Sequence, residues 1–224
     1  MKHDEVNPYF QKDAWRVFRI ISEFVDGFER LTDLGPSVTV FGSSRIKPGS
    51  HYYKMGVEVS RQLTLKKFAI ITGGGPGIME AANKGAKKVG GRSCGVSIIV
   101  PHEKESNRYI DPQYSLKFRY FFVRKVMFIR YAQGYVFLPG GYGTLDELFE
   151  ALTLIQTKKI DPFPIYLMGT KYWKNLLCWL KETALEEGCI SPSDLDLFQL
   201  TNDPEEVAAG IEAHYLQNHT HQNF

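Results

Sequence analysis

Three times along the chain, a short run of apolar residues ends in a glycine- or serine-rich turn and leads into a stretch with helical spacing. The turns are Gly42-Ser43-Ser44-Arg45, Gly73-Gly74-Gly75-Pro76-Gly77 and Pro139-Gly140-Gly141-Tyr142-Gly143. The apolar runs before them are continuous rather than alternating, which is typical of strands buried on both faces of a parallel sheet. Strands that alternate with helices in this way predict a doubly wound, Rossmann-like α/β fold.

The same spacing rules extend this pattern over most of the chain. They predict about seven strands, at 37–41, 68–72, 94–100, 116–121, 135–138, 165–168 and 197–200. An additional amphipathic helix from Gln11 to Leu34 precedes the first strand and is stopped by Gly35-Pro36. We therefore expect an N-terminal helical extension at 1–34, one Rossmann-like domain at 35–216 with helices on both faces of its sheet, and a polar tail at 217–224.

Composition excludes several classes of protein. Of the 224 residues, 43% are hydrophobic and 23% are charged, as in ordinary globular domains. No apolar run is long enough for a membrane span and the first residues lack a signal pattern, so we expect a cytoplasmic protein without membrane contacts.

The three cysteines form no C-x-x-C pair, which argues against a zinc site. Basic residues are spread along the chain at a net charge of +2, so nucleic acid is not an expected partner.

The third turn carries the best functional signal. In a doubly wound sheet, ligands bind beyond the carboxyl ends of the strands, and all three turns lie at that edge. The third turn also opens a helix, whose unpaired N–H groups and positive dipole end suit a phosphate. Glu147 follows one turn later and would lie beside whatever the phosphate carries.

Glu147 has two interpretations. Thr144-x-x-Glu147 before an apolar helix is also the pattern of a capping box, which needs no chemistry. Arg124-Lys125, at the strand-to-helix junction one unit earlier, favours a chemical role, provided that the fourth and fifth strands are neighbours. An arginine facing Glu147 would keep the carboxyl ionised at neutral pH.

The sequence does not match several other familiar motifs. Ile78 stands where the dinucleotide fingerprint needs glycine or alanine, and the chain contains neither a G-x-x-x-x-G-K-[ST] loop nor a G-x-S-x-G elbow. For the turn at 73–77, structural and functional interpretations are equally favoured. His219-x-His221 lies in the polar tail, where solvated histidines are expected rather than a metal site. No cofactor and no metal are expected.

With these residues identified, the chain resembles the LOG ("lonely guy") family of cytokinin riboside 5'-monophosphate phosphoribohydrolases, which also carries an old lysine decarboxylase label. The family's P-G-G-x-G-T-x-x-E motif is matched in full by residues 139–147, and its Arg-Lys pair by Arg124-Lys125, 23 residues before Glu147. The likeness spans roughly residues 38–211. The segment 121–128 departs from the plant-type pattern and looks more like the larger bacterial branch.

The resemblance implies a nucleotide-binding hydrolase, similar to AMP nucleosidases. It would cleave the N-glycosidic bond of a purine nucleoside 5'-monophosphate, of cytokinin or AMP type, to free base and ribose 5-phosphate. Arg124 and Glu147 would be catalytic, with Glu147 as stabiliser, base or nucleophile. Glu103 would reach the pocket from its loop. The expected substrate-binding residues are Ser43, Gly74, Gly75, Lys125, Gly140, Gly141, Tyr142, Gly143, Thr144 and Thr153.

Two alternatives stay open at this point. One is a non-catalytic carrier of a nucleotide or of molybdenum cofactor on the same fold. The other is a protein whose main role is assembly, with the amphipathic first helix as a subunit interface. The family resemblance also implies a homodimer or a higher homo-oligomer.

Overall fold

Seven parallel strands form the centre of the molecule. The computed structural model describes residues 8–99 and 106–218. The strands lie in the order β4-β3-β2-β1-β5-β6-β7, and every neighbouring pair is parallel. Their bounds are β1 Ser37–Phe41, β2 Ala69–Thr72, β3 Ser93–Ile98, β4 Ser115–Phe118, β5 Ala132–Phe137, β6 Ile165–Met168 and β7 Gln199–Thr201. The predicted doubly wound α/β fold is confirmed.

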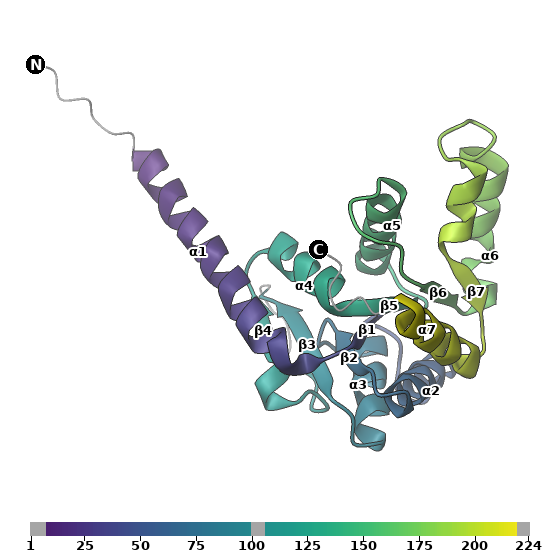
Figure 1. The fold of residues 1–224 in the computed structure, drawn as a ribbon, viewed down its shortest axis with the longest axis horizontal. Helices are drawn as coiled ribbons and strands as arrows, with labels where there is room; N and C mark the ends of the chain where they lie inside the picture. The colour runs from purple at the N-terminus through teal and green to yellow at the C-terminus, as the bar shows by residue number, and fades with distance from the viewer. Residues whose placement is uncertain (1–7, 100–105, 219–224) are drawn as a thin grey trace, which may run out of the picture.

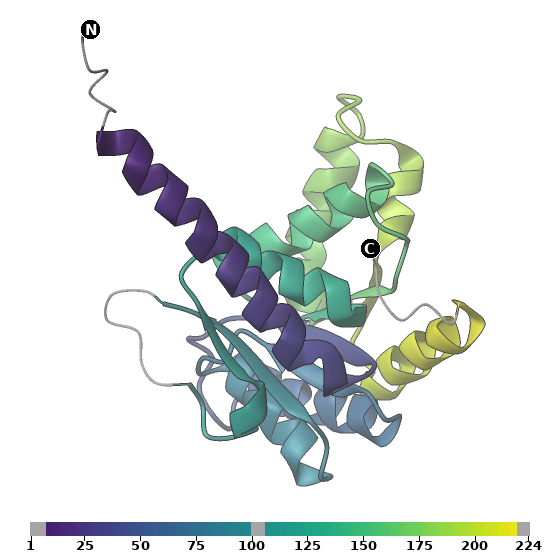
Figure 2. The ribbon, with the colours of Figure 1, turned by 60° about the vertical axis from the view of Figure 1, so that its left-hand side comes forward.

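Two layers of helices cover the sheet (Figures 1 and 2). The first layer contains α1 Pro8–Leu31, α4 Phe121–Tyr131, α5 Tyr142–Gln156 and α6 Thr170–Trp179, which share one hydrophobic core. The second contains α2 His51–Leu65, α3 Ile78–Lys88 and α7 Pro204–Asn218, which share another. Short helical turns complete the chain: η1 Thr32–Leu34, η2 Pro112–Tyr114, η3 Leu180–Ala184 and η4 Pro192–Leu197.

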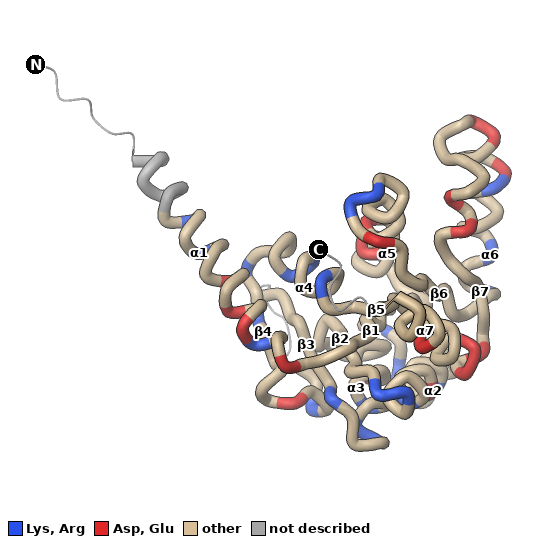
Figure 3. The backbone as a smooth tube through the Cα atoms, viewed as in Figure 1, with Lys and Arg blue, Asp and Glu red and all other residues tan. Residues whose placement is uncertain are grey.

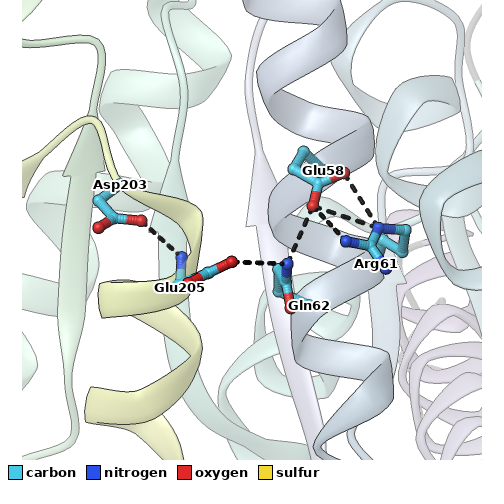
Figure 4. A network of polar contacts seen from close by, with 5 residues as sticks. All are labelled: Glu58, Arg61, Gln62, Asp203 and Glu205. Atoms are coloured by element: carbon cyan, nitrogen blue, oxygen red, sulfur yellow. Dashed lines mark hydrogen bonds and ion pairs between the residues drawn. The ribbon is translucent and has the colours of Figure 1, made fainter.

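The second layer is tied together by polar contacts as well as by its core. Gln62 of α2 donates to Glu58 in its own helix at 3.0 Å and to Glu205 of α7 at 3.4 Å (Figure 4). Asp203 accepts the Glu205 amide at 2.9 Å and so caps the start of α7. Basic and acidic residues are mixed along both layers (Figure 3), and no described helix is long and apolar enough to cross a membrane.

Helix α1 contacts the domain through its C-terminal part, while its N-terminal part projects beyond the sheet (Figure 1). A Cβ on Gly27 would lie 2.8 Å from the Met127 sulfur, so glycine permits close packing against α4. The Glu23 carboxylate accepts the backbone amides of Arg119 at 2.9 Å and Tyr120 at 3.3 Å. This contact accompanies a boundary that differs from the prediction: β4 ends at Phe118 and α4 begins at Phe121, within the strand expected at 116–121.

The strand order places a topological switch point between β1 and β5. From β1 the sheet continues to β2, β3 and β4 on one side and to β5, β6 and β7 on the other. Phe41 pairs with Phe137 at the carboxyl ends of these two strands, and the Ser43 amide donates to the Pro139 carbonyl at 2.9 Å just beyond them. Ligands of doubly wound folds bind at such a point because the connections diverge and leave a crevice.

Candidate active site

A cavity of about 660 Å³ lies at the switch point. This size suits a small-molecule ligand. Its walls come from the end of β1 and the turn after it, the start of the turn after β2, one residue of α3, helix α4, the start of α5 with the turn before it, and one residue of α6. The lining residues are Phe41, Gly42, Ser43, Ser44, Arg45, Gly73, Met79, Arg124, Phe128, Gly140, Gly141, Tyr142, Gly143, Thr144, Leu145, Glu147 and Tyr172.

Helix α5 begins earlier than a capping box would require. Its N-cap is Gly141, without a side-chain capping bond, so Thr144 is the third helical residue and Glu147 the sixth. A capping box needs the threonine at the N-cap itself. The capping interpretation of Glu147 is therefore wrong, because the glycines start the helix before Thr144.

The first turn of α5 offers backbone donors to the cavity. The amides of Tyr142 and Gly143 have no intrahelical acceptor, because the first N–H groups of any helix lack one. The Thr144 amide donates to the Gly141 carbonyl at 2.9 Å, so it is already used. Of the donors expected for a phosphate, the Thr144 amide is therefore used within the fold, while the amides of Tyr142 and Gly143 and the Thr144 hydroxyl stay candidates.

Gly140 allows Thr144 to lie directly against the preceding turn. A Cβ on Gly140 would lie 2.0 Å from the Thr144 hydroxyl oxygen, whereas a Cβ on Gly141 or Gly143 would meet nothing within 4 Å. The Tyr172 hydroxyl of α6 donates to the Gly140 carbonyl from the other side. Two side chains, Thr144 and Tyr172, therefore hold the turn, and only Thr144 was predicted from the sequence to lie at the site.

Glu147 is buried at the wall of this cavity, with 4% of its side chain exposed. Its Oε1 lies 3.7 Å from the Arg124 guanidinium and its Oε2 lies 3.9 Å from the Lys125 ammonium. Among the described residues, Oε1 has no hydrogen-bond partner. Burial raises the pKa of Glu147 to about 7, although Lys125 and Arg124 both lower it. Contrary to the prediction from the sequence, Arg124 therefore does not keep the Glu147 carboxyl fully ionised at neutral pH. Desolvation raises the pKa of this carboxyl more than the two cations, both beyond hydrogen-bond distance, lower it.

Arg124 reaches Glu147 by a route that the sequence did not reveal. The strands β4 and β5 are not neighbours, since β3, β2 and β1 lie between them. Helix α4 instead connects β4 to β5 across the face of the sheet, and it carries Arg124 to the start of α5 (Figure 1). The guanidinium stacks over the rings of Phe121 and Phe128, with centroid distances of 4.9 and 5.5 Å. This cation–π stacking fixes its plane.

Lys125 takes a different position from Arg124. Its ammonium lies 2.8 Å from Asp146 and 2.9 Å from Glu150, both on α5, and it is not part of the cavity wall. Burial lowers the pKa of Lys125, but hydrogen bonds to Asp146 and Glu150 together with the charge of Glu147 raise it overall. Lys125 thus joins α4 to α5 behind Glu147, which gives no support to its expected contact with substrate phosphate.

Polar groups of the turn at 73–77 form hydrogen bonds with other residues of the same chain. The Gly74 amide donates to the Thr72 hydroxyl at 3.0 Å, and the Gly74 carbonyl accepts the Asn107 amide at 2.8 Å. The Asn107 side chain donates to the Gly75 carbonyl at 3.1 Å. Only Gly73 of this turn lines the cavity. For Gly74 and Gly75 these contacts favour the structural interpretation over substrate binding.

Asn83 of α3 holds this region together, and it was not among the residues predicted from the sequence. Its side-chain oxygen accepts from Thr72 at 2.7 Å and from Asn107 at 2.9 Å. Its amide group donates to Ser93 at 2.8 Å and to the Cys94 carbonyl at 3.1 Å. The sequence did contain a signal for this role, namely an asparagine between the buried residues Ala82 and Ala86 on an apolar helix face.

The remaining expected residues have three different outcomes. Ser43 lines the cavity, and its hydroxyl accepts the Arg45 amide at 3.1 Å. Thr153 lies farther along α5, outside the cavity wall, and its hydroxyl donates to the Phe149 carbonyl at 2.6 Å. Glu103 lies outside the described residues, as does His219-x-His221. Within 8–99 and 106–218, no group of three histidine, cysteine or acidic side chains is placed to hold a metal.

The fold and the cavity define an α/β protein whose ligand crevice lies at the switch point of a parallel sheet. A family model described as "Possible lysine decarboxylase" matches residues 79–211, which is more than half of the chain. The cytokinin riboside 5'-monophosphate phosphoribohydrolase LOG5 of Arabidopsis thaliana is 26% identical over 180 residues, covering 79% of this chain and 77% of the relative. LOG4 of the same plant is 30% identical over 153 residues, covering 67% and 69%. The chain therefore belongs to the LOG family.

Solved structures agree on the fold. The molybdenum cofactor binding protein from the phototrophic bacterium Rippkaea orientalis has a TM-score of 0.55 at 20% identity, covering 80% of this chain and 94% of the other. The Moco carrier protein from Chlamydomonas reinhardtii also has a TM-score of 0.55, at 18% identity, covering 82% and 99%. At such identities the likeness shows the architecture alone.

Proposed function

We propose that this protein hydrolyses the N-glycosidic bond of a purine nucleoside 5'-monophosphate, of cytokinin or AMP type, releasing the free base and ribose 5-phosphate. Membership of a family whose relatives are phosphoribohydrolases supports this reaction. The observation that carries the proposal is the buried Glu147 carboxyl, facing Arg124 in a cavity that also contains a helix N-terminus.

The 5'-phosphate would bind at the first turn of α5. The amides of Tyr142 and Gly143 and the Thr144 hydroxyl provide donors there, and the helix dipole favours an anion. Glu147 lies four residues beyond Gly143, a rise of about 6 Å along the helix. A phosphate held at the first turn would therefore place the attached sugar beside the carboxyl. Binding the phosphate, which does not react, orients the anomeric carbon.

Glu147 would act in its carboxylate form. Cleavage of a glycosidic bond passes through an oxocarbenium-like state, in which positive charge develops on the sugar. A carboxylate can stabilise that charge, activate the attacking water or form a covalent bond to the anomeric carbon. Arg124 would orient the carboxylate and favour its ionised form. The reaction as proposed uses neither a metal nor a cofactor.

Product analysis tests this proposal directly. The protein is incubated with AMP or with isopentenyladenosine 5'-monophosphate, and the products are separated by chromatography. We expect free base and ribose 5-phosphate in equal amounts, well in excess of the enzyme. A folded protein that releases no base from any nucleoside monophosphate would refute the proposal.

The fold neighbours favour one alternative, a non-catalytic carrier of a nucleotide or of molybdenum cofactor. The same incubation separates the two functions. A carrier would return the nucleotide unchanged and bind it in at most stoichiometric amount, whereas an enzyme would turn over many equivalents.

Three further features belong to this proposal. Residues 35–216 would contain the whole nucleotide-binding catalytic domain, between the helical extension at 1–34 and the polar tail at 217–224. The protein would act as a homodimer or a higher homo-oligomer. A cytoplasmic location stays a prediction.

A further inference from the structure

Among the described residues, the charged side chains in the cavity wall are Arg45, Arg124 and Glu147. Arg124 faces the Glu147 carboxylate at 3.7 Å and is stacked over two aromatic rings, so its charge is already directed at that acid. When Glu147 is ionised, these two charges cancel. The remaining positive charge of the cavity wall is therefore that of Arg45, to which the proposed reaction assigns no role.

Arg45 belongs to the turn that follows β1, and the fold holds this turn from two sides. The Ser43 amide donates to the Pro139 carbonyl at 2.9 Å, which joins the turn to the segment before α5. The Ser43 carbonyl accepts the Ile78 amide at 3.0 Å, which joins the turn to the start of α3. The Arg45 amide donates to the Ser43 hydroxyl at 3.1 Å. Arg45 is thus attached to a backbone that is fixed next to the start of α5.

The Arg45 side chain is available to a ligand. It is exposed, and among the described residues its guanidinium forms neither an ion pair nor a hydrogen bond. Lys47 is exposed in the same turn but is not part of the cavity wall. Lys125 is already used, because its ammonium binds Asp146 and Glu150 on α5. Arg45 is therefore the cation that the cavity wall offers to an anionic ligand.

A phosphate monoester matches the groups around Arg45. It carries close to two negative charges at neutral pH, since its second pKa is about 6. A guanidinium presents its N–H donors in a planar fork that fits two phosphate oxygens. Residues 141–144 line the same cavity, and the helix dipole there adds roughly half a positive charge. The buried Glu147 oxygen without a hydrogen bond among the described residues is an independent sign that a ligand fills this cavity.

We propose that Arg45 binds the phosphate group of the ligand, so that the cavity selects phosphorylated nucleosides over free nucleosides. The nucleoside part of the ligand rests on the proposed function, whereas the role of Arg45 rests on the charges of the cavity wall. The phosphate lies between the Arg45 guanidinium and the first turn of α5. Arg124 keeps its contact with Glu147, so one arginine serves the phosphate and the other serves the carboxylate.

Equilibrium binding tests this proposal separately from turnover. AMP and adenosine are titrated into the Glu147→Gln protein in a calorimeter. Adding Arg45→Ala to this protein should weaken AMP binding about tenfold or more, because a charge-assisted contact is lost. Adenosine binding should stay within about twofold, since adenosine has no phosphate for Arg45 to contact.

Two further variants separate a specific contact from general surface charge. Lys47→Ala is the matched control, because it removes a cation from the same turn but not from the cavity wall, and it should leave the affinity for AMP unchanged. Arg45→Lys keeps the charge without the fork, so its affinity for AMP should lie between those of the Arg45 and Arg45→Ala proteins. Added salt should weaken AMP binding less steeply after Arg45→Ala than before it.

Several results would overturn the proposal. These are an unchanged AMP affinity in Arg45→Ala, an equal loss of AMP and adenosine affinity, the same loss of AMP affinity in Lys47→Ala, or a protein that binds AMP no more tightly than adenosine before Arg45 is replaced. Failure of the wild-type protein to release base would refute the proposed hydrolysis alone, because recognition of the phosphate is measured by binding.

Discussion

Two glycine-rich turns follow the strands β2 and β5, which lie on either side of β1, yet their polar groups are used differently. The turn at 73–77 is filled by its own chain, since Thr72 and Asn107 use the polar groups of Gly74 and Gly75. The turn at 139–143 instead contributes Gly140, Gly141, Tyr142 and Gly143 to the cavity wall, whereas only Gly73 of the earlier turn lies there. A glycine-rich turn after a parallel strand is therefore not a ligand site by itself. Its polar groups must also be left unused by the fold.

The acids that follow the two turns differ in the same way. Glu80, in the first turn of α3, accepts a hydrogen bond from the Tyr53 hydroxyl at 2.9 Å. Glu147, in α5, is buried in the cavity wall and its Oε1 lacks a hydrogen bond among the described residues. A buried oxygen without a hydrogen bond is costly to keep, which is the expected signature of a functional group.

The largest difference should come from replacing each of these two acids with glutamine. Glu147→Gln removes the carboxylate and keeps the shape, so kcat should fall about 10³-fold, or roughly 4 kcal/mol, while nucleotide binding persists. Glu80→Gln, measured in the same base-release assay, should leave kcat within about threefold because that residue serves packing. Comparable losses in the two variants would remove the distinction between the turns.

The next effect concerns stability rather than turnover. Asn83→Ala leaves four polar partners around the turn at 73–77 without their hydrogen bonds and should lower the free energy of unfolding by about 3 kcal/mol. For a chain of this size the melting temperature should fall by roughly 10 °C. Lys88→Ala, exposed on the same helix, should change it by less than about 2 °C. An Asn83→Ala protein that melts like wild type would show that the network does not hold the turn.

Adding a single methyl group to a glycine should affect activity differently in the two turns. Gly140→Ala places its Cβ 2.0 Å from the buried Thr144 hydroxyl, which displaces the start of α5. We expect kcat/KM to fall about 100-fold, or roughly 2.7 kcal/mol. In Gly75→Ala the Cβ meets only the flexible end of Met79 at 2.7 Å, so activity should change by less than about threefold. Equal losses would return Gly75 to the substrate-binding set that the sequence predicted.

The smallest effect is a pH dependence. Since burial raises the pKa of Glu147 to about 7 and the proposed reaction needs the carboxylate, kcat/KM should rise with pH and reach half its plateau near pH 7. Stability should change in the opposite direction. The folded state binds the Glu147 proton more tightly than the unfolded state, so this group's contribution is complete below about pH 4.5 and is lost as pH rises through about 7.

Thermal unfolding of wild type and Glu147→Gln across this pH range checks the sign. The wild-type melting temperature should decline relative to that of the variant as pH rises. A wild-type protein that gains stability over the variant in the same range would mean that Arg124 and Lys125 outweigh burial.

Much of the fold could be predicted because it depends on local pattern. The strand at 165–168 and the helix start at Asp203 and Pro204 were predicted correctly, since continuous apolar runs and capping residues act within a few positions. The boundary between β4 and α4 was not, because the Glu23 carboxylate that binds the amides there comes from nearly a hundred residues away.

The features of the candidate site can likewise be separated into those that local sequence predicts and those that tertiary contacts decide. The sequence alone determined a parallel α/β sheet and the P-G-G-x-G-T-x-x-E motif, because residue types and short spacings express these features. It also predicted that the Arg124-Lys125 segment faces Glu147, but from a neighbouring pair of strands that the sheet does not contain. Only the tertiary structure decided that α4 crosses the sheet, that Arg124 faces the cavity while Lys125 lies behind it, and that Asn107 binds the turn at 73–77. Strand order and burial arise from contacts between distant segments. Burial in turn sets the pKa of Glu147 to about 7, which no local pattern contains.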